Sequence, residues 1–182
     1  LTYWDSGTGI FHALDNTYTE VDTFQAGHGY STDVHELQIL PNQHALLMSY
    51  DTEVISNTNQ VIPNGRITAT VTGLIVQELD TAKNVVFEWR SWDHFQITDT
   101  TDIYLQSEPV DYVHGNAIEL DTDGNLLLSS RHLNEITKIN RQTGAIIWRL
   151  GGKHNQFTFK GDNRSFSHQH DIRRLAKGHI TL

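Results

Sequence analysis

The sequence predicts an all-β protein made of repeated four-stranded units, which is the plan of a β-propeller. Short apolar or alternating runs occupy most of the chain, and Pro-Asn, Asp-Gly, Thr-Gly and Gly-Gly steps separate them. No segment holds a 3.6-residue apolar period over three helical turns. Two kinds of hairpin recur in the same order, and this repetition favours a propeller over a sandwich or a barrel.

The expected strands are short runs rich in aliphatic, β-branched or aromatic residues. These runs are residues 38–50, 73–79, 85–89, 117–120, 126–130, 135–139 and 145–148. Residues 51–73, between the first two runs, are polar and turn-rich, and they predict an insertion.

The two hairpins align with later copies of themselves. In the first, residues 39–49 match residues 119–129 in one register. In the second, residues 75–89 match residues 136–148, and residues 11–24 carry a weaker copy. Since one hairpin of each kind makes four strands, each pair is expected to form one blade.

The blade pieces are expected to belong to a single propeller domain. They are the end of one blade, two whole blades and the start of another, at about residues 1–27, 28–95, 110–155 and 165–182. A closed propeller needs at least about four blades, and the last repeat breaks off within its second strand. The chain, which lacks an initiator Met, is therefore expected to be a segment of a larger parent chain. Association of copies into a homo-oligomer is the other way to close the ring.

Composition and charge exclude several classes of function. The chain has 182 residues, with 13 Lys and Arg against 22 Asp and Glu, and its formal net charge is −9. Without a basic run, it is not expected to bind nucleic acid. No stretch approaches the roughly 18 apolar residues of a membrane-spanning helix. The absence of cysteine excludes disulfides, thiolate catalysis and cysteine-ligated zinc.

Histidine is unusually abundant, with 11 residues, and three repeats open on histidine just before their first strand. These openings contain His35, His114 and the pair His168 and His170. The first strands of propeller blades line the central channel, so we expect these side chains to converge on one pocket. Arg131 follows the second strand of its repeat, and a short loop is expected to return it to the same end of the channel.

Such a cluster suits an anionic substrate with a transferable group. A neutral imidazole is a nucleophile, a second imidazole can protonate a leaving oxygen, and a guanidinium can bind sulfate or phosphate oxygens with two hydrogen bonds. Because the overall charge is negative, the attraction for such a substrate has to be local.

Two other interpretations stay open at this point. The histidines can be structural caps that satisfy backbone groups where blades begin. His168 and His170, spaced as His-x-His, can also be metal ligands, with Asp171 and His35 completing the set for a metal-dependent hydrolase.

Four stretches together resemble the arylsulfotransferase family. They contain the motifs His-x-Asn, Ser-Ser-Arg-His, Trp-x-Leu-Gly-Gly and Gln-His, and they lie at residues 111–118, 123–132, 136–152 and 166–173. No single motif is specific, but the combination is, and its order and spacing hold from about Asp33 to the C-terminus. The resemblance implies a six-bladed propeller, of which this chain is the central part.

The resemblance also implies an activity. A sulfuryl group would pass from a phenolic sulfate ester to a phenol through a sulfohistidine, without a nucleotide donor, a metal or another cofactor. The roles implied by the motifs are those of nucleophile for His170, sulfuryl binding for His114 and Arg131, proton donation for His35, and substrate binding for Asn116 and His168.

An enzyme of this type is expected to be secreted or periplasmic. The alternative on the same fold is a non-enzymatic extracellular propeller that serves as a structural or binding module.

Overall fold

A computed structural model describes the backbone of residues 1–182 and the side chains of residues 1–101 and 104–182. Its strands, in chain order, are β1 (Thr2–Asp5), β2 (Ile10–Leu14), β3 (Glu20–Phe24), β4 (Ser31–Ile39), β5 (Ala45–Ser56), β6 (Thr68–Leu79), β7 (Val85–Arg90), β8 (Val110–Asp111), β9 (Gly115–Leu120), β10 (Leu126–Ser130), β11 (Glu135–Ile139), β12 (Ile146–Gly151), β13 (Arg173–Arg174) and β14 (Ile180–Thr181). The helical turns are η1 (Thr58–Gln60), η2 (Ser91–Asp93), η3 (Ile97–Asp99) and α1 (Asp102–Leu105). Within the described part of the chain, no helix has the length and apolar character needed to cross a membrane.

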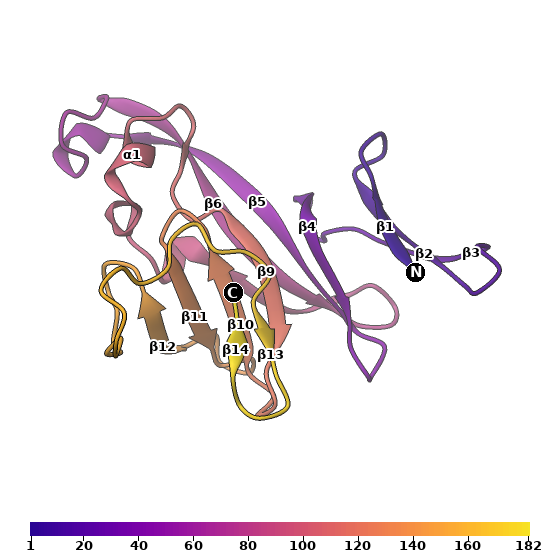
Figure 1. The fold of residues 1–182 in the computed structure, drawn as a ribbon. Helices are drawn as coiled ribbons and strands as arrows, with labels where there is room; N and C mark the ends of the chain where they lie inside the picture. Colours follow the sequence, from indigo (N-terminus) through magenta and orange to yellow (C-terminus); the bar gives the residue numbers. More distant parts are fainter.

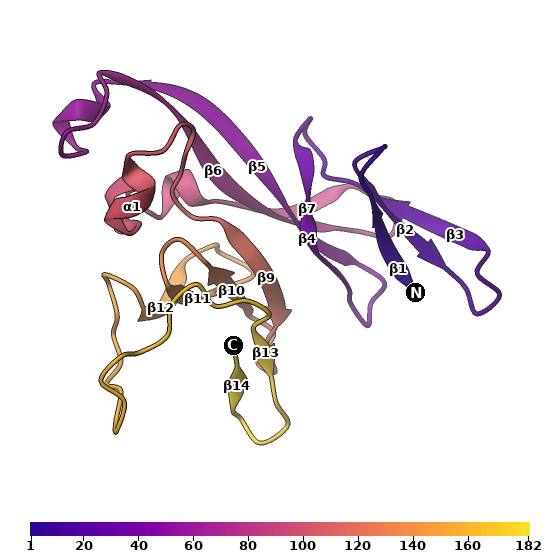
Figure 2. The ribbon, with the colours of Figure 1, turned by 45° about the horizontal axis from the view of Figure 1, so that its top comes forward.

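The strands form four sheets that follow one another along the chain (Figures 1 and 2). The first contains β1, β2 and β3, and the second contains β4, β5, β6 and β7, with β8 pairing in parallel to β6. The third contains β9, β10, β11 and β12, and the last is the hairpin of β13 and β14. Apart from β8, neighbouring strands are antiparallel, as hairpin connections require. The all-β class is therefore confirmed, and the closed propeller stays a prediction.

The hairpin of β5 and β6 is longer than the sequence indicated. The two strands stay paired out to Ser56 opposite Thr68. Residues 51–56 and 68–73 are therefore strand, and the expected turn-rich insertion is confined to the tip at residues 57–67, which carries η1. Several of the polar residues in this extension are Thr, which is β-branched and suits a pleated, half-exposed strand.

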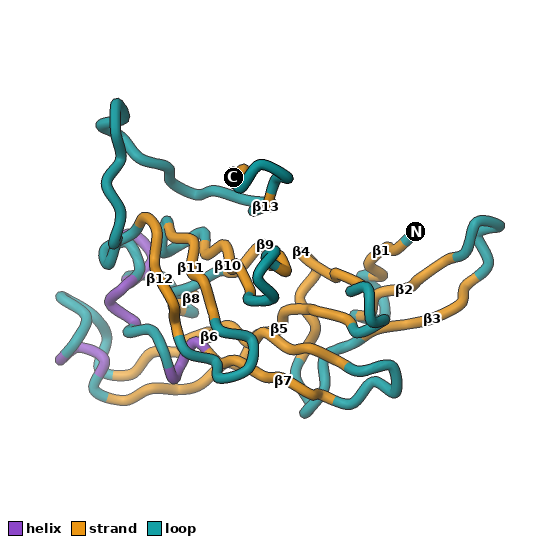
Figure 3. The backbone as a smooth tube through the Cα atoms, turned by 90° about the horizontal axis from the view of Figure 1, so that it is seen from below, coloured by secondary structure: helices purple, strands orange, loops and turns teal.

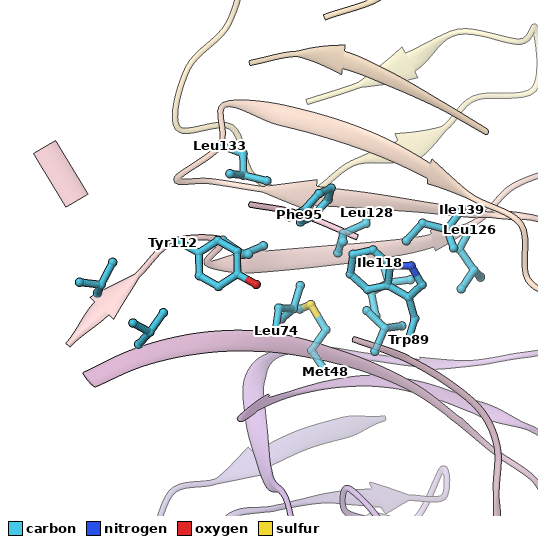
Figure 4. Packing of buried hydrophobic residues seen from close by; sticks show 14 of the residues in the cluster. Met48, Leu74, Trp89, Phe95, Tyr112, Ile118, Leu126, Leu128, Leu133 and Ile139 are labelled. Atoms are coloured by element: carbon cyan, nitrogen blue, oxygen red, sulfur yellow. The ribbon is translucent and has the colours of Figure 1, made fainter. Parts of the chain in front are cut away.

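The main hydrophobic core lies between the second and third sheets (Figure 4). Met48, Leu74 and Trp89 enter it from the second sheet. Ile118 and Leu128 enter it from the third sheet, and all five residues are at most 1% exposed. Face-to-face packing of apolar side chains thus joins two sheets that come from separate stretches of the sequence.

Both of these sheets are also covered on their other face. Leu47 of β5 packs with Phe11 and Phe24 of the first sheet. Leu127 of β10 packs with Ile172, next to β13. Because successive side chains of a strand point to opposite faces, burial on both faces explains why these strands are continuous apolar runs in the sequence.

Buried charges also connect the sheets. Asp121, in the turn between β9 and β10, is 4% exposed and accepts hydrogen bonds from Lys138 Nζ on β11 and Arg174 Nε on β13, both at 2.7 Å. The hydrogen bond from Arg174 is the largest of the effects that hold the pKa of Asp121 well below its ordinary value of 3.8. Glu78 on β6 makes a comparable link, because Arg141 Nε in the turn after β11 donates to it at 2.6 Å.

Asp121→Asn is expected to lower the free energy of unfolding by about 3 kcal/mol at neutral pH, because it leaves two largely buried cations without their shared carboxylate. The ionised form is the stabilising one, and its pKa is depressed in the folded state. The difference between the two proteins should therefore be full above 3.8 and shrink as the pH falls toward the folded-state pKa. Urea unfolding at neutral and acidic pH measures this difference.

Asp123→Asn is the matched control for that experiment. Asp123 also lies 2.6 Å from Lys138 Nζ, but its side chain is 50% exposed. A loss of at most about 1 kcal/mol is expected. Equal losses for the two variants would mean that the burial of Asp121 does not decide the strength of the link.

Candidate functional site

Three of the predicted site histidines lie next to one another where the sheets meet. His35 is in the middle of β4, His114 directly precedes β9, and His170 lies in the loop between β12 and β13. The ring centroids of His35 and His114 are 5.5 Å apart, and those of His35 and His170 are 6.4 Å apart. Segments that are distant in the sequence thus bring three imidazoles to one place.

The loop that carries His170 is long but anchored. Figure 3 shows it running out from β12 and returning to β13. Gln169 is 7% exposed, and its Nε2 donates to the Glu135 carbonyl oxygen at 3.0 Å. Asn116 Nδ2 in turn donates to the Gln169 carbonyl oxygen at 2.8 Å. This buried anchor holds the loop, while His168 and His170 on either side of it are exposed.

Asn116 lies under this loop, and its expected part in substrate binding stays a prediction. It is 5% exposed, and its side-chain amide donates to the Gln169 carbonyl oxygen in the loop. The structure thus gives Asn116 a contact with the segment that bears His170.

A column of stacked rings continues from His114 into the protein. The His114 ring stacks on His132, with centroids 4.4 Å apart, and His132 stacks on Tyr104 of α1 at 3.5 Å. His132 follows β10 and is 7% exposed. The column gives the His114 ring a rigid support, since it leaves little room for rotation of the side chain.

Arg131 is held beside this column at its backbone and at its side chain. Its backbone N–H donates to the His114 carbonyl oxygen at 2.9 Å. Its Nη1 donates to the Tyr104 hydroxyl at 2.6 Å, and the same hydroxyl lies 2.8 Å from His168 Nε2. Because a guanidinium can only donate, the proton of the hydroxyl is free to point at His168. Tyr104 thus connects two of the predicted site residues.

The hydrogen bonds of the rings identify which nitrogen faces the site. His170 Nδ1 lies 2.9 Å from the His168 carbonyl oxygen, and His132 Nδ1 lies 2.6 Å from the Asp111 carbonyl oxygen. A carbonyl can only accept, so both Nδ1 atoms carry the hydrogen. In the neutral rings the lone pair is then on Nε2.

For His35 and His114, the partner of ring Nδ1 is a carboxylate instead of a backbone carbonyl. His35 Nδ1 lies 2.8 Å from Asp33 Oδ1, and His114 Nδ1 lies 2.6 Å from Asp111 Oδ2. Both acids also accept the backbone N–H of their histidine, at 2.9 Å and 3.1 Å. Each acid therefore holds both the backbone and the ring of its partner.

The backbone around the site is unusual. His114, His168 and Asp171 have φ angles of 49°, 54° and 62°, in the left-handed region that non-glycine residues seldom adopt. Such conformations persist where surrounding contacts enforce them, and they are common at functional sites.

Burial sets the protonation state of the inner groups. Burial is the main cause that lowers the pKa of His132 below its ordinary value of 6.5, so the ring is neutral in the column. Burial first, and then the negative charges of Asp33 and Asp111, raise the pKa of Tyr50. Tyr50 therefore stays a neutral phenol, and its hydroxyl donates to the Gly115 carbonyl oxygen at 3.2 Å.

The metal interpretation can be compared with this geometry. Among the described side chains, Asp111, His114 and His132 offer ligand atoms that all lie within 4.8 Å of one another. Within this group, His114 Nδ1 bonds to the Asp111 carboxylate, and His132 Nδ1 bonds to the backbone carbonyl oxygen of the same residue. The His-x-His pair does not form such a group in the described part of the chain, and His168 Nε2 is engaged by the Tyr104 hydroxyl.

Four residues of this arrangement were not assigned a role by the sequence. Asp33 and Asp111 lie just before the histidines that they hold, and His132 directly follows Arg131, so their spacing was an available signal. Tyr104 had no such signal, because it lies in the irregular connection between β7 and β8. Its contacts to Arg131 and His168 arise from the fold alone.

The chain can be compared with known protein families. The model of the family described as Arylsulfotransferase (ASST) matches residues 1–181, which is nearly the whole chain. No curated protein matches significantly.

The neutral state of His132 can be tested by NMR. Its imidazole is expected to keep a single Nδ1 hydrogen at pH 6.5 and to titrate below that value, because burial disfavours the cation. Folding stability should correspondingly fall as the pH drops below 6.5, since the unfolded chain binds that proton more readily. Imidazole ¹⁵N shifts follow the titration, and a His132→Gln variant assigns the signal. A titration above 6.5 would contradict the argument from burial.

Proposed function

The chain belongs to the arylsulfotransferase family, and on that basis we propose that it transfers a sulfuryl group from a phenolic sulfate ester to a phenol through a sulfohistidine at His170. The observation that carries this proposal is the meeting of His35, His114 and His170, with Arg131 bonded to the backbone of His114. Three imidazoles and a guanidinium supply a nucleophile, a proton donor and binding groups for an anion.

In the first half-reaction, the Nε2 lone pair of His170 attacks the sulfur of the donor. The N–S bond forms as the bond from sulfur to the aryl oxygen breaks, and that oxygen leaves as a phenol after taking a proton from a neighbouring imidazolium. Arg131 and the imidazole of His35 or His114 that does not give the proton hold the sulfuryl oxygens, and this stabilises the charge that they carry as the group is transferred.

In the second half-reaction, an acceptor phenol takes the place of the first. The neutral imidazole that lost its proton now removes the proton of the acceptor hydroxyl, and the phenolic oxygen attacks the sulfur. The N–S bond breaks, and its electron pair returns to His170. The two half-reactions are the reverse of each other, so one set of residues serves both.

The wider parts of the proposal concern the assembly and its location. The second and third sheets are buried on both faces, as neighbouring blades in a propeller are, and this supports a ring of blades with the histidines at its channel. An enzyme that uses aryl sulfates as donors needs no nucleotide, and we propose a secreted or periplasmic location for it.

His170→Ala is expected to abolish covalent sulfonation. A chromogenic aryl sulfate mixed with the native protein, without an acceptor, should release close to one equivalent of phenol in a burst, and mass spectrometry should find the sulfonated peptide that contains His170. The variant should give neither, because no other ring has a neutral Nε2 at that position.

His179→Ala is the matched control, since His179 is an exposed histidine of the β13–β14 hairpin, outside the cluster. It should retain the burst in full. A folded native protein that shows no burst and no label with several donors would favour the alternative of a non-enzymatic structural or binding module.

Tyr104→Phe tests the connection between Arg131 and His168. Removing the hydroxyl is expected to lower kcat/KM for the aryl sulfate about tenfold, since a hydrogen bond to a charged group contributes about 1.5 kcal/mol. Tyr3→Phe, on an exposed tyrosine of β1, is the control and should change nothing. Faster turnover by Tyr104→Phe would show instead that the hydroxyl competes with the substrate for Arg131.

A further inference from the structure

The three histidines of the cluster differ in the group that accepts the hydrogen bond from ring Nδ1. For His35 and His114 it is a carboxylate, and for His170 it is a backbone carbonyl. We propose that Asp33 and Asp111 are positioning residues that make His35 and His114 the proton donors to the departing phenol. The ring of His170, whose Nδ1 bonds to the His168 carbonyl oxygen, is then the neutral nucleophile. This inference rests on the proposed function and adds a division of roles within the site.

The geometry of the two acids supports this division. Asp33 Oδ1 accepts both the ring Nδ1–H and the backbone N–H of His35, at 2.8 Å and 2.9 Å, and Asp33 is 6% exposed. Asp111 divides the same task between its two oxygens, with Oδ2 on the ring of His114 at 2.6 Å and Oδ1 on its backbone at 3.1 Å. Both rings are therefore held with Nδ1 toward the acid, and Nε2 is the nitrogen left for the substrate.

Charge then separates the roles. A carboxylate hydrogen-bonded to an imidazole favours the imidazolium, because the two opposite charges lie in contact. The partner of His170 Nδ1 is the neutral His168 carbonyl oxygen, at 2.9 Å, which stabilises a positive charge on the ring less. An imidazolium can give a proton and cannot attack sulfur, whereas a neutral imidazole can attack.

The surroundings agree with this assignment. The other titratable groups around the three rings include Tyr50, Tyr104, Arg131, His132, His168 and Asp171, together with Glu36, which follows His35 and pairs with Arg173 at 2.8 Å. Burial keeps His132 neutral, so it adds no positive charge beside His114. Tyr50 also stays neutral, because burial and the charges of both acids raise its pKa. Asp171 is paired with Arg173 at 2.7 Å, so its charge is already balanced next to His170.

The proposed step follows from these roles. His170 Nε2 bonds to sulfur, the bond from sulfur to the aryl oxygen breaks, and the oxygen takes the Nε2 proton of His35 or His114. The ring that gave the proton is then a neutral imidazole, still hydrogen-bonded to its aspartate, and it can accept the proton of the incoming phenol. Proton donation matters most for a phenol of low acidity, since a nitrophenolate leaves without help.

The test is the leaving-group dependence of Asp33→Asn and Asp111→Asn. Asparagine keeps one oxygen and removes the charge. In Asp33→Asn that oxygen can still accept both N–H groups of His35, whereas Asp111→Asn keeps an oxygen for the ring of His114 and loses the acceptor of its backbone N–H. With phenyl sulfate, the rate of His170 sulfonation should fall by about 100-fold or more, the usual contribution of general acid catalysis. With 4-nitrophenyl sulfate it should fall far less, and the burst with its label on His170 should remain. The loss should appear in the sulfonation rate and leave the KM for the donor nearly unchanged.

Glu88→Gln is the matched control, because Glu88 Oε2 lies 2.7 Å from Nδ1 of His28, a carboxylate–histidine pair outside the cluster. It should not alter the rate with either donor. Equal losses with both donors in the two Asp variants would overturn the inference and leave the acids with a structural role.

The native protein offers a second measurement that does not depend on the folding of the variants. Across a series of aryl sulfates, the sulfonation rate should vary little with the acidity of the leaving phenol, because the proton is supplied in the step. A steep dependence would overturn the inference while the burst and label upheld the sulfohistidine. No burst with any donor would overturn the proposed function, and this inference with it.

Discussion

The close approach of the second and third sheets is the constraint on which the site depends. A Cβ added to Gly115 would lie 2.6 Å from Leu74 Cδ2 and 3.1 Å from Met48 Sδ, so only glycine lets β9 come this near to β5 and β6. The Tyr50 hydroxyl bonds to the Gly115 carbonyl oxygen across the same contact. His114 is the residue before Gly115, and this packing brings it beside His35 of the neighbouring sheet.

The third histidine depends on a polar anchor. Gln169 is buried under the loop after β12, where its side chain and carbonyl bond to β11 and to Asn116 of β9. A buried amide that lost these partners would be costly, so the loop has one favoured position and His170 reaches His35 from it. The ion pairs of Asp121 secure the hairpin that follows this loop. Apolar packing thus places two imidazoles, and hydrogen bonding places the third.

The chemistry of the cluster comes from differences between similar side chains. Four imidazoles, those of His35, His114, His132 and His170, are near neighbours. The rings of His35 and His114 bond to carboxylates. The exposed ring of His170 and the buried ring of His132 each bond to a backbone carbonyl. Since the environment of a ring decides its charge and its free nitrogen, one residue type can supply a nucleophile, proton donors and a neutral spacer within one site.

The sequence by itself determined the β class, the recurring hairpins and the histidines that open the repeats, because strand periodicity and turn residues act locally. It also led to His35, His114 and His170 through their places at the openings of the repeats, and to Arg131 through its place after a second strand. It could not show that Asn116 supports a loop, that the β5–β6 hairpin extends through the expected insertion, or that Tyr104 connects Arg131 to His168. The contacts of Asn116 and Tyr104 join segments distant in the chain, and the hairpin extension is a matter of pairing between two strands. Only the packing of sheet on sheet decides which of the many available polar groups meet.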